Sequence, residues 1–522
     1  MLMSDSDGII HTFQQRRQLE EELDALAATH AQPALQQAVH RLAEQFPTEL
    51  LLPAVLRRLG TANSQLRGGL GLLCTLLPAQ GVADALRGVA GNRQKTPQER
   101  TTAALILQRF LDQPTAPALL ADLAGADEAP YQSLLEAVAE GRQNRHVLLE
   151  YVTQMQEHPT DVAFMVLRLI DRLPPTDSAE LLRLIAHDSR RQVAHAAIDR
   201  LAAAAGGAGG EACLRSLHTL ALSLPPEDAA LAERSLRKLQ FSGKRYTPPS
   251  TDGWQALLGP SDPSGYISVW FVRQPSEEAG AEQADGVWLG FILSLQGGIL
   301  QFSGSEGMQR DFLPPPTAAG SLVTVRTSGT QNTVLLVAPL DVGRWLVRRA
   351  LEAHWQQPTP QPLPGEYTLY NDLIWQFAAP HLPADLTAWW ERSAAQGGQP
   401  PSASALAAAA HALAEEAAME AWLRWSLITW QNVKYRSQQA PAVPSRTLVS
   451  LLLRELGRMP DHRALLQAMT AGLRVQTLWY AVAGDPANAE RAALLAQATA
   501  TLPITENPFI ADLLERGLGK QA

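Results

Sequence analysis

Twelve histidines are the first residues in this sequence to test for metal or acid–base chemistry. Metal sites on helices draw on ligands three or four positions apart, and no two histidines here have either spacing. His187 and His195 are eight apart, with Asp188 beside the first, which fits surface or capped residues better than a metal site. The two cysteines, Cys74 and Cys213, are too few for a disulfide framework or a four-cysteine zinc site. We therefore expect no metal and no cofactor.

Glycine-rich and acidic segments give no stronger sign of catalysis. Gly68-Gly69-Leu70-Gly71 is not followed by the lysine of a phosphate-binding loop, and no Gly-x-Ser-x-Gly sequence occurs. The carboxylate pairs Glu277-Glu278 and Glu415-Glu416 are interpreted by default as solvated surface, since a general acid needs a desolvated pocket. Both cysteines lie in helical apolar sequence and are expected in the core. We assign no catalytic residue and favour a protein that is not an enzyme.

Arginines give the first candidate binding surface, because guanidinium groups bind carboxylates and phosphates through paired donors. Five of them are assigned to partner binding: Arg67, Arg100, Arg168, Arg191 and Arg237. On one face of a helical array they would form a ridge for an acidic peptide or a phosphate backbone. The alternative is an Asp/Arg ladder between neighbouring repeats, with Asp161, Asp171 and Asp188 as partners. Residues 1–245 hold 25 basic and 28 acidic side chains, which favours the ladder.

Tryptophans give the second candidate site. All twelve lie at or after Trp254, so the composition changes sharply at that point. Trp270, Trp288 and Trp375 are candidates to line a pocket where strand-like sequence meets the helices that follow. Trp389-Trp390 and the spaced Trp422, Trp425 and Trp430 could build a further aromatic pocket or interface anchor. Trp422 and Trp425 share a helical face, so burial between helices is the simpler interpretation.

A helical pattern repeats between about residues 30 and 240. Stripes at i, i+4 and i+8 begin at Leu66, Glu99, Leu134, Val162, Val193 and Leu231, in steps of 33, 35, 28, 31 and 38 residues. Glu99 is the exception to their apolar character. Each step has room for two helices and their turns, and a single helix pair cannot bury its apolar face alone. The pattern predicts stacked helix pairs.

The turn sequences of these units resemble the HEAT/armadillo class of α-solenoid. Asn63-Ser64-Gln65-Leu66-Arg67 matches the polar turn residue and the aliphatic–arginine pair of a HEAT unit, and Thr96-Pro97-Gln98-Glu99-Arg100 matches it in part. The resemblance covers roughly residues 30–240. It implies a curved scaffold whose second helices line the concave face, and it implies no reaction.

Between residues 246 and 340 the pattern becomes strand-like. Residues 266–273, 286–295, 299–302, 322–325 and 333–337 are rich in β-branched and aromatic side chains and predict strands. Gln296-Gly297-Gly298 predicts a tight turn, and 276–285 an acidic loop. Both faces of the central strands are apolar, so we expect helices to cover one of them.

Residues 341–522 return to helical spacing. We expect helices over 342–354, capped by Asp341, and over 367–375 and 403–436. The predicted fold is therefore mainly α: an N-terminal HEAT-like α-solenoid (1–245), a small antiparallel β-containing module (246–340) and a C-terminal helical domain (341–522).

Charge and hydropathy limit the classes of partner. The net charge of -9 argues against nucleic acid, no apolar run is long enough for a spanning helix, and no secretory signal is visible. We expect a cytoplasmic protein without membrane contact, and 38 arginines against 5 lysines favour a bacterial source. The leading hypothesis is a non-enzymatic HEAT-repeat scaffold or adaptor that binds a protein partner through its concave surface. The alternative is an enzyme or ligand-binding protein with a pocket between the β module and the C-terminal helices.

Overall fold

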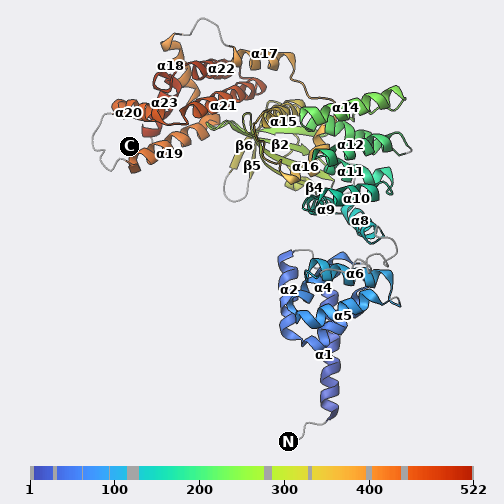
Figure 1. Ribbon diagram of the computed structural model, residues 1–522. Helices are drawn as coiled ribbons and strands as arrows, with labels where there is room; N and C mark the ends of the chain where they lie inside the picture. The colour runs from blue at the N-terminus through green and yellow to red at the C-terminus, as the bar shows by residue number, and fades with distance from the viewer. Residues whose placement is uncertain are drawn as a thin grey trace. The chain divides into compact units, whose positions relative to one another are not determined.

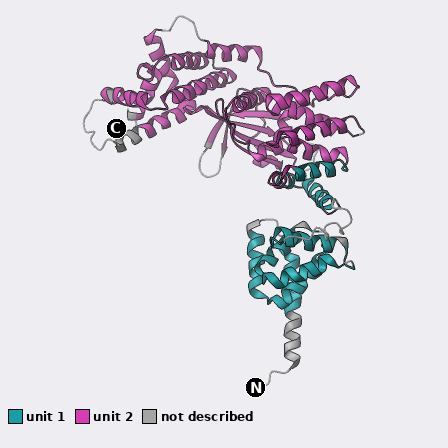
Figure 2. Cartoon of the chain, in the orientation of Figure 1, with its two compact units in different colours: residues 1–151, 161–173 teal, residues 152–160, 174–522 magenta. Residues whose placement is uncertain are grey.

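The computed structural model describes residues 5–27, 32–61, 63–92, 94–113, 128–207, 209–275, 285–326, 332–395, 402–436 and 445–519. The chain forms two compact units, shown in Figure 2. The first comprises residues 1–151 and 161–173, and the second comprises 152–160 and 174–522. The domain boundaries predicted at 245 and 340 both lie inside the second unit.

The first unit is helical, and its described helices are α1 (Asp5–Leu26), α2 (Gln32–Gln45), α3 (Thr48–Arg58), α4 (Ser64–Leu76), α5 (Ala79–Gly91), α6 (Pro97–Arg109) and α8 (Glu128–Gly141). The helices α9 (His146–Gln156) and α10 (Thr160–Ile170) lie at the unit boundary. Asn63 begins α4 by accepting a hydrogen bond from the Leu66 amide at 2.9 Å. Thr96 and Glu99 form a reciprocal capping box on α6. The capping role explains why an acidic residue interrupts the apolar stripe at Glu99.

The second unit begins with stacked helices, α11 (Pro175–Ile185), α12 (Arg191–Ala205), α13 (Glu211–Ser223) and α14 (Pro226–Phe241). Helix α11 packs against α12 and α13, and α12 packs against α13 and α14 (Figure 1). The six stripes found in the sequence fall on α4, α6, α8, α10, α12 and α14, so the predicted alternation of helices is present. The relation to HEAT or armadillo repeats stays a prediction.

One six-stranded antiparallel sheet follows, with strand order β4-β3-β2-β1-β6-β5. Its strands are β1 (Trp254–Leu258), β2 (Tyr266–Arg273), β3 (Gly286–Ser294), β4 (Gly298–Met308), β5 (Leu322–Arg326) and β6 (Asn332–Ala338). The five predicted strands correspond to β2–β6, and β1 was not predicted. Most of the predicted acidic loop, 276–284, lies outside the described residues.

Helices cover one face of the sheet, as predicted. Helices α15 (Leu340–Trp355) and α16 (Gly365–Trp375) lie against the face that carries Phe271 and Phe291. A Cβ at Gly343 would lie 2.9 Å from Cε1 of Phe271, so glycine allows α15 to approach closely. The predicted cap of α15 was wrong: Pro339 occupies the N-cap, and Asp341 lies in the first turn, 2.8 Å from the guanidinium of Arg344.

The C-terminal helices are α17 (Ala384–Ala394), α18 (Ala403–Leu413), α19 (Glu420–Arg436), α20 (Ser445–Arg458), α21 (His462–Val482), α22 (Pro486–Thr501) and α23 (Pro508–Gly519). The single helix predicted over 403–436 is two helices, because the chain turns at 414–419 and brings Met419 into the core. Helices predominate around one small antiparallel sheet, which confirms the predicted mainly-α class.

The loop between β1 and β2 fixes the sheet to these helices. The buried hydroxyl of Ser261 donates to the Gly472 carbonyl at 2.7 Å. The Trp422 indole donates to the Ser261 carbonyl at 2.7 Å, and the Trp479 indole to the Leu258 carbonyl at 3.1 Å. These bonds hold α21 beside the sheet, within the second unit.

Candidate functional site

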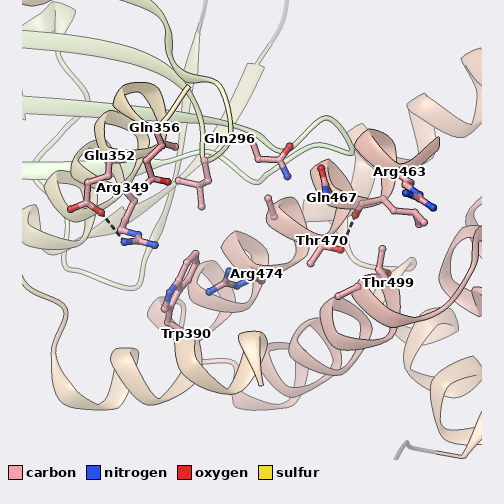
Figure 3. Close-up of a pocket in the computed structure, with 15 residues that line it drawn as sticks. Gln296, Arg349, Glu352, Gln356, Trp390, Arg463, Gln467, Thr470, Arg474 and Thr499 are labelled. Carbon is pink, nitrogen blue, oxygen red and sulfur yellow. Dashed lines mark hydrogen bonds and ion pairs between the residues drawn. The ribbon is translucent and has the colours of Figure 1, made fainter. Parts of the chain in front are cut away.

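A cleft of about 530 Å³ lies within the second unit, where the turn after β3 faces the C-terminal helices (Figure 3). Residues of α15 form one wall, and residues of α21 form the other. Trp390 of α17, the end of α22 and the turn residues Leu295 and Gln296 complete the lining. The volume is in the range of small-molecule sites. Three arginines and one glutamate are its charged residues, so the lining is cationic in a chain of charge -9.

Arg474 is the central cation of the cleft. Its guanidinium carbon lies 4.0 Å from the centroid of the Trp390 ring, and its Nε donates to the buried Ser393 hydroxyl at 3.5 Å. Within the described residues, neither terminal nitrogen of Arg474 has a hydrogen-bond acceptor or an acidic partner. Burial lowers the pKa of Arg474, and the positive charge of Arg349 lowers it further. The partly buried Arg474 and the exposed Arg349 therefore lie close enough to repel each other, and an anion between them would stabilise both.

Arg349 enters the cleft from α15 and is held by its own helix. Its Nη1 donates to Glu352 at 2.7 Å, and the other oxygen of Glu352 accepts from Arg348 at 3.3 Å. The ring of Trp345 packs edge-on against Trp390, with centroids 4.9 Å apart. Figure 3 shows Arg349 and Arg474 projecting from opposite sides toward the same space. This arrangement presents two forked cations beside an aromatic wall.

The two walls are built by helical periodicity. On α21, Arg463, Gln467, Thr470 and Arg474 occupy positions i, i+4, i+7 and i+11, which share one face. On α15, the lining residues Arg349, Glu352 and Ala353 have the same kind of spacing, and Gln356 follows at the C-cap. Neither wall was assigned from the sequence. The polar stripe on α21 was the available signal, but its partner wall lies more than a hundred residues away along the chain.

The three tryptophans predicted to line a pocket are elsewhere. Trp270 and Trp288 are partly buried on the sheet face opposite α15, with ring centroids 5.5 Å apart. Trp375 is fully buried on α16 and donates to the Tyr367 hydroxyl at 2.9 Å. None of the three is among the residues that line the cleft. The predicted location, between the β module and the C-terminal helices, nevertheless contains this cleft.

Three of the five candidate arginines belong to the first unit. Arg67 on α4 forms a two-point ion pair with Glu136 on α8. Arg100 is 8 % exposed and donates from Nε to the Ala90 carbonyl at 3.0 Å, so it lies inside the packing of α5 and α6. Arg168 is exposed on α10. Of these three, Arg168 has the side chain most accessible to a binding partner.

The other two candidates belong to the second unit. Arg191 on α12 pairs with Glu227 of α14 at 2.5 Å, and its Nε lies 3.8 Å from Asp228. Arg237 is exposed on α14 and lies 3.7 Å from Glu233 on the same helix. The alternative to a binding ridge is a ladder of ion pairs between neighbouring helices. The pairing of Arg191 on α12 with acidic residues of α14 is an ion pair of this type. The partner-binding role of all five arginines stays a prediction.

The histidines and cysteines considered at the start lie apart from one another. His187 contacts Asn371 at 3.1 Å, whereas His195 contacts Asp228 at 2.7 Å. Cys74 and Cys213 are buried, as expected, and burial raises their thiol pKa values to about 12 and about 11. In the described part of the chain, no cluster of three or more His, Cys, Asp or Glu residues has the geometry of a metal site.

Comparisons with known proteins give no information on function, so the function is inferred from the geometry of the cleft. No family model, curated protein or solved structure matches the chain. Among the described helices, none combines the length and apolar character needed to cross a bilayer.

Proposed function

We propose that this protein is a non-enzymatic binding protein, and that the cleft between α15 and α21 holds the anionic group of its ligand. The observation that carries the proposal is the arrangement of Arg474. Its guanidinium is stacked on Trp390 and oriented by Ser393, and its terminal nitrogens have no acceptor among the described residues. A guanidinium in this state is prepared for two-point binding of a carboxylate or a phosphate.

Arg349 is a second cation beside Arg474, so an anion is the class of ligand that fits the cleft best. Arg349 and Arg474 repel each other, and an anion placed between them removes that repulsion while gaining two charge-assisted contacts. Stacking on Trp390 and the hydrogen bond from Arg349 to Glu352 restrict both side chains before the ligand arrives. Less side-chain freedom is then lost on binding.

Binding is a better account of this lining than catalysis. Glu352 is the one carboxylate among the described lining residues, and its oxygens accept from Arg348 and Arg349. It therefore serves to orient a cation. The rest of the lining supplies amides, one tryptophan, two threonines and aliphatic side chains, which suit recognition more than proton transfer.

The stacked helices favour a second role in the same protein. Helices α11–α14 pack in the alternating order of a solenoid, and the exposed Arg237 and Arg191 lie on its alternate helices. We propose, as the second candidate, that these repeats are a scaffold for a protein partner. The cytoplasmic location and bacterial source expected from the sequence remain part of this proposal.

Calorimetric titration of the full chain at low ionic strength tests the binding proposal. Citrate, inorganic phosphate and a capped glutamate-containing peptide are the probes. We expect at least one to bind with 1:1 stoichiometry, and Arg474→Gln to weaken it about tenfold, the effect of losing a charge-assisted pair. Arg424→Gln is the matched control, because Arg424 is exposed on α19 and its ion-pair partner among the described residues is Glu420 of its own helix. Equal binding by Arg474→Gln, or no binding of any probe, overturns the proposal.

A further inference from the structure

The cleft has cations at two places along α21, and the space between these two places is called the trough. Arg463 and Arg474 lie on one face of α21, eleven residues apart, which corresponds to about 16 Å along the helix axis. Arg349 faces the Arg474 end. Arg463 is exposed, and no acidic side chain pairs with it within the described part of the chain. A compact anion held by Arg349 and Arg474 would not reach Arg463.

Three amide side chains line the trough, and Gln296 and Gln467 lie between its two ends in Figure 3. Gln296 comes from the turn after β3, Gln356 directly follows α15, and Gln467 comes from α21. Figure 3 shows all three beside the same trough. A carboxamide offers both donors and an acceptor, as a peptide group does. In the described structure these three carboxamides make no hydrogen bond to another side chain or to the backbone.

We propose that the ligand is an extended acidic segment of a polypeptide, with one carboxylate at Arg349 and Arg474 and a second at Arg463. The inference rests on the proposed function and adds the class of ligand. Extended chain covers about 3.3 Å per residue and its side chains alternate between two faces, so the two carboxylates are placed four positions apart, on the same face, and the long arginine side chains span the remaining distance. The glutamines face the intervening peptide groups, and Leu295 and Leu466 face small apolar side chains.

A polypeptide fits this trough better than a single-stranded nucleic acid. Nucleic-acid grooves carry a continuous row of cations and free aromatic faces on which bases stack. Here the cations lie at the ends, amides lie in the middle, and one face of Trp390 is covered by Arg474. Glu352 of α15 also lines the cleft. Its carboxylate repels an acidic peptide weakly, because Arg348 and Arg349 both donate to it and compensate its negative charge.

Titration with three capped peptides tests the inference. The first carries two glutamates separated by three Gly or Ser residues, so that both face the same side of the extended chain. The second carries two adjacent glutamates, and the third carries glutamine at both spaced positions. We expect the spaced diglutamate peptide to bind best. Arg463→Gln and Arg474→Gln should each weaken it about five- to tenfold, since each removes one charge-assisted contact. Arg474→Lys keeps the charge without the fork and should recover part of the loss.

The controls separate this inference from the function on which it rests. Arg463→Gln should leave the affinity for the adjacent-diglutamate peptide unchanged, Arg424→Gln should leave every affinity unchanged, and thermal unfolding should show that all variants fold. If citrate or phosphate binds as tightly as the spaced peptide and Arg463→Gln has no effect, the extended-peptide inference is overturned while the anion cleft stands. Tighter binding of an RNA oligonucleotide, sensitive to Arg463→Gln, also overturns it. If no anion binds, both proposals fail.

Discussion

The guanidinium of Arg183 on α11 hydrogen-bonds the side-chain amide oxygen of Asn371 on α16, and both residues are 1 % exposed. The same guanidinium donates to the Leu369 carbonyl at 2.8 Å and to the Thr368 carbonyl at 2.5 Å. Asp372 is 3.7 Å away. One buried arginine thus joins the stacked helices to the helix that covers the sheet, and its hydrogen bonds offset the free energy of burying a charge.

Replacing this arginine should destabilise the second unit. In Arg183→Met, Asn371 and the two carbonyls lose a buried charged donor, and we expect a loss of about 3 kcal/mol in the free energy of unfolding. Tryptophan fluorescence during urea unfolding measures the effect, because all twelve tryptophans lie in this unit. Arg234→Met, at an exposed position on α14, should change stability by less than about 0.5 kcal/mol. A loss of that small size in Arg183→Met would contradict the assigned role.

Arg344 holds the other end of α16. Its Nε donates to the Ile374 carbonyl at 2.7 Å, and its Nη2 donates to the Ala378 carbonyl at 2.7 Å. Lysine cannot supply this fork, so Arg344→Lys should cost about 2 kcal/mol even though the charge is kept. Arg349→Lys, on the exposed side of α15, is the matched control and should cost under about 0.5 kcal/mol in urea unfolding. Equal costs for the two variants would show that the fork of Arg344 does not matter.

The local pattern of this sequence predicted most elements, because it depends on near neighbours. The β-branched and aromatic run from Tyr266 to Arg273 matches β2 at both ends, and the helical stripes match the alternate helices of the repeats. The strand β1 was missed because Trp254–Leu258 is short and holds no β-branched residue. The break at 414–419 contains no Pro or Gly and is set by burial of Met419.

The cleft could not be predicted in the same way. Arg349 and Arg474 face each other because the loop at Ser261 fixes α21 beside the sheet that α15 covers, and no spacing in the sequence shows that contact. The pocket tryptophans were chosen for their chemistry, yet Trp375 bonds Tyr367 inside the core. The alternative hypothesis placed a pocket where the β module meets the helices, and a role for this cleft as that pocket stays a prediction, whereas the identity of the lining was not predicted.

Acid should weaken the second unit through His187. Burial and the charge of Arg183 lower the pKa of His187 from 6.5 to about 3. Below pH 6.5 the unfolded chain therefore binds a proton that the folded chain does not, so stability falls as the pH decreases from 6.5 toward 3. The slope for this group approaches about 1.4 kcal/mol per pH unit. His187→Asn should flatten the dependence in urea unfolding between pH 7 and pH 5. His381→Asn, at an exposed position, should leave it unchanged.

The scaffold hypothesis makes a prediction about the exposed arginines. Arg168 and Arg237 are exposed, so Arg168→Glu with Arg237→Glu should change the free energy of unfolding by less than about 0.5 kcal/mol. Arg100→Glu should instead unfold part of the first unit, because it buries a carboxylate beside the Ala90 carbonyl. If the repeats bind an acidic partner, the exposed double variant should lose a stoichiometric partner that the native chain retains in affinity purification from its host. Arg424→Glu, on α19, is the charge-matched control and should retain it. Retention of the partner by the folded double variant would remove these two arginines from the interface.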